Sequence, residues 1–507
     1  MQRYLTFDIG TTALKTALIS EEGAVFAVHT EEYALKTPQP GWAEMTPEAY
    51  CRAAIAGTRA VLSSFPLSCQ ETGLGGLRSA ASARPGEAIA AIGFASQGQS
   101  FVALDGKGKP LRDAIVWVDN RALQIAQRWE REWLSREEYR RISGYPFLPE
   151  GLTVFKLAWL AEHEPEAHRA WKFLCLPDYL IWRLTGETAT DYNIAQMSGL
   201  YDLRAQAWEP RLLEAAGIGE EQLPRVYPPG TVVGELQAGA AEALGLRAGT
   251  PVCVGCNDQL AGAVGAGNVA PGLVTETTGT ALAVVVTTRE LLEDGRFFVG
   301  KHAAPGLYYA MPFAPTSAIV LTWLRDLCAQ GADYGEFLAG VEQLPPGCEG
   351  LTILPHFCGT ATPTFNPQAR GVIAGLSLGH TRAHLARAVM EACACLLQEC
   401  LEPLQERGVA VSDVRSLGGA ARNDLWLQIK ADLLGLPVER PACADAANLG
   451  AAMLAATGVG QFGTVTEAAE AWYRPARRFE PEAARFAAYR EVYARYRDVY
   501  ARLYGVT

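Results

Sequence analysis

The order of apolar and polar residues predicts that strands and helices alternate along the chain. Three apolar runs separated by short polar turns predict an antiparallel meander at residues 4–9, 14–19 and 24–29. Apolar residues then recur at helical spacing over 47–62, and a further strand is expected at 88–95. The stretch between them, 63–87, is rich in Gly, Ser and Ala and is interpreted as a surface loop or insertion.

The same opening pattern returns in the second half of the chain. Strands are expected at 273–277 and 281–287 around a second Gly-Thr turn, followed by a long helix at 383–406. Near the end, aromatic residues at steps of three and four mark one face of a helix and indicate core packing, at positions 486, 489, 493, 496 and 500. Two α/β lobes are therefore expected, which we divide at residues 1–256 and 257–507.

Composition narrows the classes of protein to which the chain can belong. It has 507 residues, of which 49% are hydrophobic and 20% charged, so it is expected to be globular with more than one core. The 44 basic and 55 acidic side chains leave a net charge of −11, which argues against a nucleic-acid partner. Of the twelve cysteines, Cys253 and Cys256 form a C-x-x-C without a second pair of zinc ligands, so buried thiols are expected.

The first residues and the length of the apolar runs indicate where in the cell the protein is expected. Residues 1–3 lead directly into an apolar strand without a charged and apolar leader, and no apolar run approaches the roughly 18 residues of a membrane span. We therefore expect a cytoplasmic protein with no membrane partner.

The first candidate site is the turn that follows the first strand. Asp8 closes that strand, and an unpaired carboxylate there needs a partner such as a divalent metal ion. Gly10 allows backbone N–H groups to approach an anion, Thr11 and Thr12 add hydroxyl donors, and Lys15 is either a source of positive charge or a solvated strand residue. The alternative is a structural hairpin in which Asp8 caps its own turn.

The turn at Thr278, Gly279 and Thr280 repeats this element in the second lobe. Two such turns facing each other across a cleft would offer two sets of donors to a chain of phosphates. Neither turn fits the P-loop or the Rossmann glycine pattern. Together they favour a nucleotide held between two lobes.

Asp258 is the candidate for a general base. It lies where a strand runs into a helix, and small residues at 262, 265 and 266 permit that helix to pack closely. In the first turn the helix dipole favours an ionised carboxylate, and the same field is expected to keep its basicity modest. The alternative is that Asp258 caps the helix, a role that Asn257 would fill equally well.

Two further passages suit ligands. Gly418 and Gly419 lie in a strand-to-helix passage, which is consistent either with backbone passing a flat ligand such as adenine or with a tight turn. Amides, an aromatic ring, a carboxylate and a guanidinium suit a polyhydroxylated ligand, and they occur at Gln97, Gly98, Gln99, Trp117, Asp119 and Arg121.

These residues carry a resemblance to the FGGY carbohydrate kinases. The stretch GLTVFKLAWLAEH at 151–163 resembles the first signature of that family. GVIAGL at 371–376, continuing through His384 and Leu385 to residues 388–391, resembles the second. The likeness extends from Asp8 to Ala452, almost the whole chain.

The resemblance implies an α/β, two-lobed actin-like ATPase fold, with duplicated ribonuclease H-like domains and an interlobe cleft. It implies transfer of the γ-phosphoryl group of MgATP to a sugar or polyol hydroxyl, and a homodimer. By similarity, Asp258 is the catalytic base and Asp8 the carboxylate near Mg²⁺. ATP would contact the two Gly-Thr turns, with Lys15 beside the first, and an adenosine motif of Gly418, Gly419, Ala420 and Asn423. The sugar pocket would use Gln97, Gly98, Gln99, Trp117, Asp119, Arg121 and Asp258. Trp42 and Glu44 resemble an early W-x-E of the family.

The substrate is less narrowly indicated. Where xylulokinases show Q-M-H-G, this chain has Gln97-Gly98-Gln99-Ser100, and their G-E-R-T-P is GTATP at 359–363. D-xylulose is the nearest candidate. Other ketoses or polyols (L-ribulose, L-fuculose, erythritol, glycerol) are alternatives, as are a catalytically idle sugar- or nucleotide-binding regulator and an actin- or Hsp70-like ATPase that moves a partner protein.

Overall fold

The computed structural model describes residues 2–64 and 89–505, so most of the interval interpreted above as a loop, 63–87, lies outside the described residues. The chain forms two compact units. The first unit comprises Met1–Val269, Gly300–Gly306 and Asp445–Tyr473, and the second Ala270–Val299, Leu307–Ala444 and Arg474–Thr507. Among the described residues, no helix combines the length and the apolar character needed to cross a membrane.

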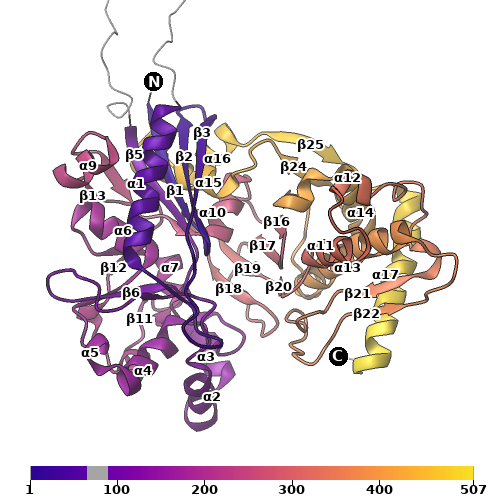
Figure 1. The fold of residues 1–507 in the computed structure, drawn as a ribbon, viewed down its shortest axis with the longest axis horizontal. Helices are drawn as coiled ribbons and strands as arrows, with labels where there is room; N and C mark the ends of the chain where they lie inside the picture. The colour runs from indigo at the N-terminus through magenta and orange to yellow at the C-terminus, as the bar shows by residue number, and fades with distance from the viewer. Residues whose placement is uncertain (1, 65–88, 506–507) are drawn as a thin grey trace, which may run out of the picture. The chain divides into compact units, whose positions relative to one another are not determined.

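The first unit is built on a sheet of seven strands in the order β13-β14-β5-β1-β2-β3, with β15 paired to β5 (Figure 1). The strands are β1 (Arg3–Ile9), β2 (Ala13–Ser20), β3 (Val25–Glu32), β5 (Ile89–Ser96), β13 (Val232–Glu235), β14 (Pro251–Cys253) and β15 (Cys256–Asn257). β1, β2 and β3 form the predicted antiparallel meander, and β5 runs parallel to β1. The carboxyl ends of β1, β5 and β15 therefore lie at one edge of the sheet.

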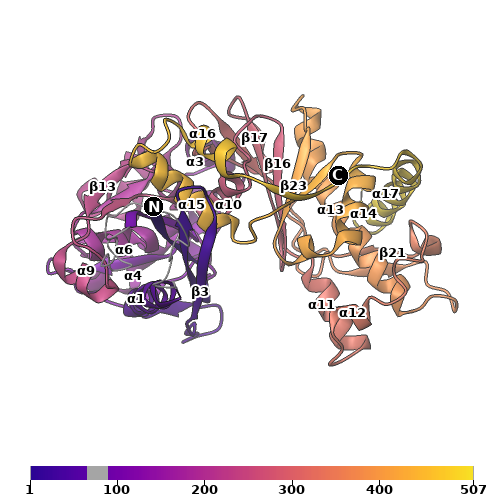
Figure 2. The same ribbon diagram turned by 90° about the horizontal axis from the view of Figure 1, so that it is seen from above.

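Helices cover both faces of this sheet. The apolar core on one face joins β1 and β5 to α1 (Pro47–Ser63), α6 (Leu176–Thr185) and α9 (Ala238–Leu244). α15 (Ala446–Gly458) packs on β1 and β5 and against α10 (Asp258–Gly265), with α16 (Val465–Trp472) beside it (Figure 2).

The remaining elements of the first unit form smaller layers. A second sheet has the order β4-β7-β6-β8, from β4 (Glu44–Met45), β7 (Ala114–Ile115), β6 (Phe101–Leu104) and β8 (Lys172–Cys175). Two strand pairs are formed by β9 (Ala189–Asp191) with β12 (Arg225–Tyr227) and by β10 (Tyr201–Asp202) with β11 (Ala207–Trp208). The helices are α2 (Leu123–Glu132), α3 (Arg136–Ser143), α4 (Thr153–His163), α5 (Pro165–His168), α7 (Tyr192–Met197), α8 (Pro210–Ala216) and a 3₁₀ turn at Glu220–Gln222.

Two glycines explain why α10 belongs to the first unit. A Cβ atom on Gly265 would lie 1.9 Å from the carbonyl oxygen of Ala446, and one on Gly450 would lie 1.9 Å from that of Ala261. The backbones of α10 and α15 are thus in direct contact, which only glycine permits. Asp258 and residues 257–269 therefore fold with the first unit. This corrects the division after residue 256, which assigned Asp258 to the second.

The second unit repeats the central pattern of the first. Its sheet has the order β18-β19-β17-β16-β23-β24-β25, with β20 on β17. The strands are β16 (Leu273–Thr278), β17 (Leu282–Thr288), β18 (Phe298–Lys301), β19 (Tyr308–Met311), β20 (Phe313–Ala314), β23 (Asp413–Leu417), β24 (Val438–Pro441) and β25 (Pro475–Phe479). As in β1, β2 and β5, two antiparallel strands flank a Gly-Thr turn and a parallel strand, β23, joins the first of them.

Helices of the second unit are α11 (Ile319–Cys328), α12 (Tyr334–Phe337), α13 (Arg382–Glu406), α14 (Asp424–Leu434) and α17 (Ala483–Tyr504). A small pair, β21 (Thr352–Leu354) and β22 (Val372–Ala374), and 3₁₀ turns at Cys348–Gly350 and Gly419–Arg422 complete it. The predicted aromatic stripe lies on α17, and Tyr489, Tyr496 and Tyr500 are buried as expected for core packing.

Candidate active site

Asp8 and Asp258 lie close enough to influence each other's charge. Burial and, to a lesser extent, the negative charge of Asp258 together raise the pKa of Asp8 to about 7, while Lys15 opposes the shift. Lys15 faces Asp8 across the β1–β2 pair, but its Nζ lies 3.3 Å from Asp445 Oδ1 and its side chain is 44% exposed. Lys15 is therefore a largely solvated, paired lysine, and the two carboxylates form the charged centre of this region.

Asp258 is the first residue of α10, and Asn257 is the cap. The Asn257 side chain accepts a hydrogen bond from the Gln259 N–H, so Asn257 and not Asp258 caps the helix. Burial raises the pKa of Asp258 to about 6, although the Gln259 N–H also donates to its Oδ1 at 2.7 Å and lowers it. The start of the helix thus lowers the pKa as expected, but desolvation outweighs it, so Asp258 is more basic than an exposed aspartate. A pKa near 6 suits a general base at neutral pH.

The first Gly-Thr turn is joined to the polar run after β5. Gln97 Nε2 donates to the Gly10 carbonyl at 2.8 Å, and the Trp117 indole N–H donates to Thr11 Oγ1 at 2.8 Å. Ser100 Oγ accepts from the Trp117 N–H and donates to Gln97 Oε1. The Gly10 N–H is used within the turn, on the Ala13 carbonyl. Residues 10, 11, 97 and 117 thus form one network, in which Trp117 remains 40% exposed.

Gly98 and Gln99 take conformations that depend on their neighbours. A Cβ atom on Gly98 would lie 2.8 Å from Met197 Cβ, so Met197 occupies the space that a side chain at 98 would need. Gln99 has a positive φ of 66° and donates from Nε2 to the Tyr145 hydroxyl at 2.9 Å. A non-glycine residue in this conformation is uncommon and is found disproportionately at functional sites.

Asp119 and Arg121 do not face a ligand, which corrects the expectation that they bind the sugar directly. Both side chains have no solvent exposure and form an ion pair at 2.7 Å. Asp119 also accepts from the Ala43 N–H, and Arg121 donates to Glu44 at 2.7 Å. The Arg121 guanidinium lies 3.8 Å from the centre of the Trp42 ring. The W-x-E pair thus encloses Arg121, and this cluster supports the segment that carries Trp117.

Lys156 is a residue of the site region that the sequence reasoning missed. It lies in the first family-like signature, is fully buried, and donates from Nζ to the carbonyls of Val116 at 2.8 Å and Trp117 at 3.4 Å. Burial lowers its pKa to about 7. Its position inside an otherwise apolar helical run was the available signal, because a lysine there must find buried acceptors.

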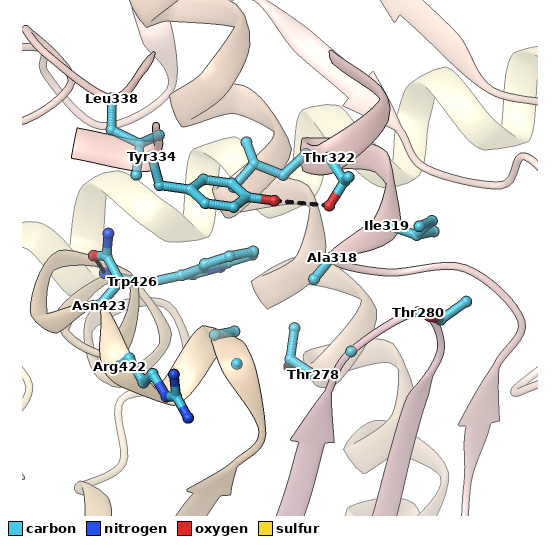
Figure 3. A pocket seen from close by; sticks show the side chains of 14 residues that line it. Thr278, Thr280, Ala318, Ile319, Thr322, Tyr334, Leu338, Arg422, Asn423 and Trp426 are labelled. Atoms are coloured by element: carbon cyan, nitrogen blue, oxygen red, sulfur yellow. Dashed lines mark hydrogen bonds between the residues drawn. The ribbon is translucent and has the colours of Figure 1, made fainter. Parts of the chain in front are cut away.

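The second unit contains a pocket of about 580 Å³, shown in Figure 3, whose size suits a nucleoside. Thr278, Gly279, Thr280, Gly419, Ala420 and Asn423 all line it, as the sequence reasoning grouped them. Gly418 precedes this wall with a φ of 79°. The other lining residues are Ala318, Ile319, Leu321, Thr322, Tyr334, Leu338, Arg422 and Trp426.

The apolar wall of this pocket could not be found from local sequence. Tyr334 is the first residue of the short helix α12, and Leu338 directly follows that helix. The Tyr334 hydroxyl is 2.8 Å from Thr322 Oγ1 (Figure 3). Trp426 lies on α14, and its indole N–H donates to the carbonyl of Met390 on α13. Nothing in the spacing of these residues marks them as neighbours of Thr278.

Two side chains of the pocket have roles other than those expected. The Thr278 hydroxyl points into the protein, because it donates to Glu276 and accepts from Lys430. Its expected use as a phosphate donor is therefore wrong. The exposed Thr280 remains available in this turn. Asn423 caps α14 by accepting from the Trp426 N–H at 3.0 Å, so its amide NH₂ group is the part that can meet a ligand.

The carboxylates of the first unit fit a magnesium ion. Mg²⁺ is usually held by one or two carboxylates, several waters and substrate phosphates. Asp8 and Asp258 are two such carboxylates, close enough that the charge of Asp258 raises the pKa of Asp8. Within residues 2–64 and 89–505, no cluster of three or more His, Cys, Asp or Glu side chains could hold a metal alone, so water and phosphate would complete the shell.

Comparison with known proteins assigns the family. The model of the N-terminal domain of the FGGY family of carbohydrate kinases matches residues 3–265, and that of its C-terminal domain matches residues 274–459. Xylulose kinase of Bacillus subtilis (strain 168) is 30% identical over 500 residues, covering 97% of this chain and 95% of the relative.

Glycerol kinase of Methylibium petroleiphilum is 31% identical over 505 residues, covering 96% of each chain. The crystal structure of xylulose kinase from Rhodospirillum rubrum superposes with a TM-score of 0.87 at 29% identity and covers 99% of each chain. The fold is thus the expected actin-like α/β fold of two lobes. The chain belongs to the FGGY family of carbohydrate kinases.

Proposed function

We propose that this carbohydrate kinase transfers the γ-phosphoryl group of MgATP to a hydroxyl of a neutral ketose or polyol, with D-xylulose as the nearest candidate. Family membership makes the protein a phosphotransferase with an alcohol group as acceptor and ATP as donor. The observation that carries the proposal is the buried Asp258, whose pKa is raised to about 6 beside Asp8 and the first Gly-Thr turn.

The pocket of the second unit supports ATP as the donor. Its apolar residues suit the adenine ring, the backbone at Gly419 and Ala420 would lie against that ring, and the Thr280 hydroxyl would face the phosphates. Arg422 is the charged side chain of the lining, is exposed, and would attract the triphosphate. The chemistry requires that the terminal phosphate of a nucleotide bound there reach the hydroxyl at Asp258.

On the acceptor side, we propose Gln97, Gln99 and Trp117 as sugar contacts. The partly exposed Trp117 would suit the apolar face of a sugar, and the two amides would suit its hydroxyls. Arg121 and Lys156 are buried and occupied by Asp119, Glu44 and backbone carbonyls, so neither offers a charge to a carboxylate. This favours a neutral acceptor over a sugar acid.

Asp258 would accept the proton of the attacking hydroxyl as phosphoryl transfer proceeds. Because the transition state is loose, the proton leaves late, and a carboxylate of moderate basicity suffices. Asp8 would hold magnesium, directly or through water, and the ion would neutralise phosphate charge. The network of Trp117 with Thr11 and of Gln97 with Gly10 would keep the sugar and the first turn in fixed relation.

The names of the relatives leave the substrate open, since they include both xylulose kinases and glycerol kinases. Residues 97–100 do not match the Q-M-H-G of xylulokinases, and Met197 fills the space above Gly98. D-xylulose is therefore tested beside L-ribulose, L-fuculose, erythritol and glycerol. We also propose a cytoplasmic location and, from the family resemblance, a homodimer that sedimentation analysis would detect.

The deciding experiment measures ADP release with and without a panel of ketoses and polyols, followed by recovery of the phosphorylated product. Stimulation by one small molecule, with phosphate on it, supports the kinase. Stimulation only by a protein would support an actin- or Hsp70-like ATPase, and no stimulation by any compound would support an idle regulator. Gluconate serves as the acidic control, and phosphorylation of gluconate in preference to every neutral compound would contradict the neutral-acceptor argument.

A further inference from the structure

A buried ion pair lies beneath the nucleotide pocket of the second unit. Glu276 and Lys430 have fully buried side chains, and Lys430 Nζ lies 2.5 Å from Glu276 Oε1. Lys430 Nζ also donates to Thr278 Oγ1 at 3.0 Å and to Ser416 Oγ at 3.2 Å. The hydroxyls of Thr278 and Ser416 both donate to Glu276. All three protons of the ammonium are thus used, and the network is satisfied.

This network joins the three elements that carry the pocket. Glu276 and Thr278 are at the end of β16, which leads into Gly279 and Thr280. Ser416 faces Glu276 on the parallel strand β23, which leads into Gly418 and Gly419. Lys430 is on α14, and its Nζ lies 5.9 Å from the ring centre of Trp426, a residue of the pocket wall. The Lys430 ammonium therefore links the strand end before the Gly279–Thr280 turn to α14, which carries Trp426 of the pocket wall.

Stability alone does not account for such a pair. Removing two charges from water costs several kcal/mol for each ion, and replacing a buried pair with apolar residues of similar size is often neutral or stabilising. Buried polar groups are better attested as devices that fix register. Here the pair would fix the position of Gly279 and Thr280 relative to α14. A binding site loses function when the residues that form it are misplaced by about 1 Å.

We infer that Lys430 is a positioning residue for the nucleotide phosphates, which holds the Gly279–Thr280 turn at a fixed distance from α14 through Thr278 and Glu276. The inference rests on the proposed binding of ATP in this pocket. Lys430 does not line the pocket and is not expected to touch the nucleotide. Its effect should therefore appear in affinity for ATP and leave the KM for the sugar unchanged.

The test compares Lys430→Met with the double variant Glu276→Leu, Lys430→Met. Melting temperature, the Kd for ATP by calorimetry, and the KM values for ATP and sugar are measured for each. Lys430→Met should lower the melting temperature, because it leaves Glu276 buried without its cation, and should raise the Kd for ATP about tenfold or more. The double variant should recover most of the melting temperature and keep the raised Kd. Recovery of both would show that the pair is only structural and would overturn the inference.

Two further variants keep the test decisive if Lys430→Met does not fold. Ser416→Ala removes one partner of the ammonium outside the pocket lining and should raise the Kd for ATP about threefold with an unchanged sugar KM. A native Kd there would contradict the inference. Tyr496→Phe, which deletes a buried hydrogen bond to Glu399 in the same unit, is the control and should lower the melting temperature alone. If the wild-type protein itself binds no ATP, the proposed function fails instead.

Discussion

Replacing Asp258 with asparagine should make the protein more stable while it removes most of the activity. The substitution keeps the size of the side chain and removes its negative charge. In the folded protein that charge is held in a poorly solvated position beside Asp8. The side chain should therefore be a source of instability that catalysis requires.

The magnitude follows from the pKa of Asp258 in the two states. Burial raises it from 3.8 to about 6, so the folded protein binds the proton more tightly than the unfolded chain does. Stability is consequently lost as the pH rises from below 3.8 through about 6, and the loss is complete above that value. The difference corresponds to at most about 3 kcal/mol near pH 8, and to about half of that near pH 5.

Calorimetric unfolding of wild type and Asp258→Asn at both pH values measures this effect. Asparagine should raise the melting temperature by roughly 3–6 °C near pH 8 and by less near pH 5. Turnover should fall by about 10²- to 10⁴-fold, as expected when a general base is lost. The wild-type kcat/KM should decline below about pH 6, where Asp258 takes up a proton.

Two results would refute this reasoning. A melting temperature of Asp258→Asn equal to or below that of wild type near pH 8 would mean that the carboxylate is not destabilised in the folded state. Near-native turnover of the variant on its best substrate would mean that Asp258 is not the base. Since the stability measurement needs no substrate, the two parts of the argument are tested separately.

Four other outcomes are expected. Higher magnesium concentration should move the acid limb of kcat/KM to lower pH, because the ion competes with the proton for Asp8, whose pKa is about 7; an unmoved limb would argue against metal at Asp8. Trp117→Phe, which loses the 2.8 Å bond to Thr11, should raise the sugar KM and leave ATP binding unchanged in calorimetry. Arg121→Met leaves Asp119 buried without its cation and should cost about 3–5 kcal/mol in denaturant unfolding, a loss that a merely solvated arginine would not produce. Gly265→Ala places a Cβ atom 1.9 Å from the Ala446 carbonyl oxygen and should reduce the free energy of unfolding by about 1–3 kcal/mol. It should also reduce kcat, because α10 is displaced. A melting temperature equal to that of wild type would contradict the described contact of α10 with α15.

Elements with a strong local pattern were predicted well. The meander of β1, β2 and β3, the helix α13 and the stripe of α17 follow from the period of apolar residues. The two Gly-Thr turns and the capped start of α10 follow from short polar motifs placed at the ends of apolar strands. Such features depend on residues a few positions apart, so the chain order contains the information that determines them.

Other features depended on contacts between distant residues. Asp258 belongs to the first unit because α10 touches α15, whose contact residue Gly450 lies far along the chain. Asp119 and Arg121 have the composition of a sugar site, yet Glu44 and Trp42 enclose them in the interior. Tyr334 enters the pocket of the second unit from a helix that has no motif.

The chain order by itself determined which strands, turns and helices form and which side chains have the chemistry for phosphoryl transfer. Only the tertiary structure decided which of those side chains are exposed, which are consumed by internal partners, and how basic Asp258 becomes. The physical reason is that desolvation and the pairing of charges depend on every atom nearby, and most of those atoms belong to residues remote in the sequence.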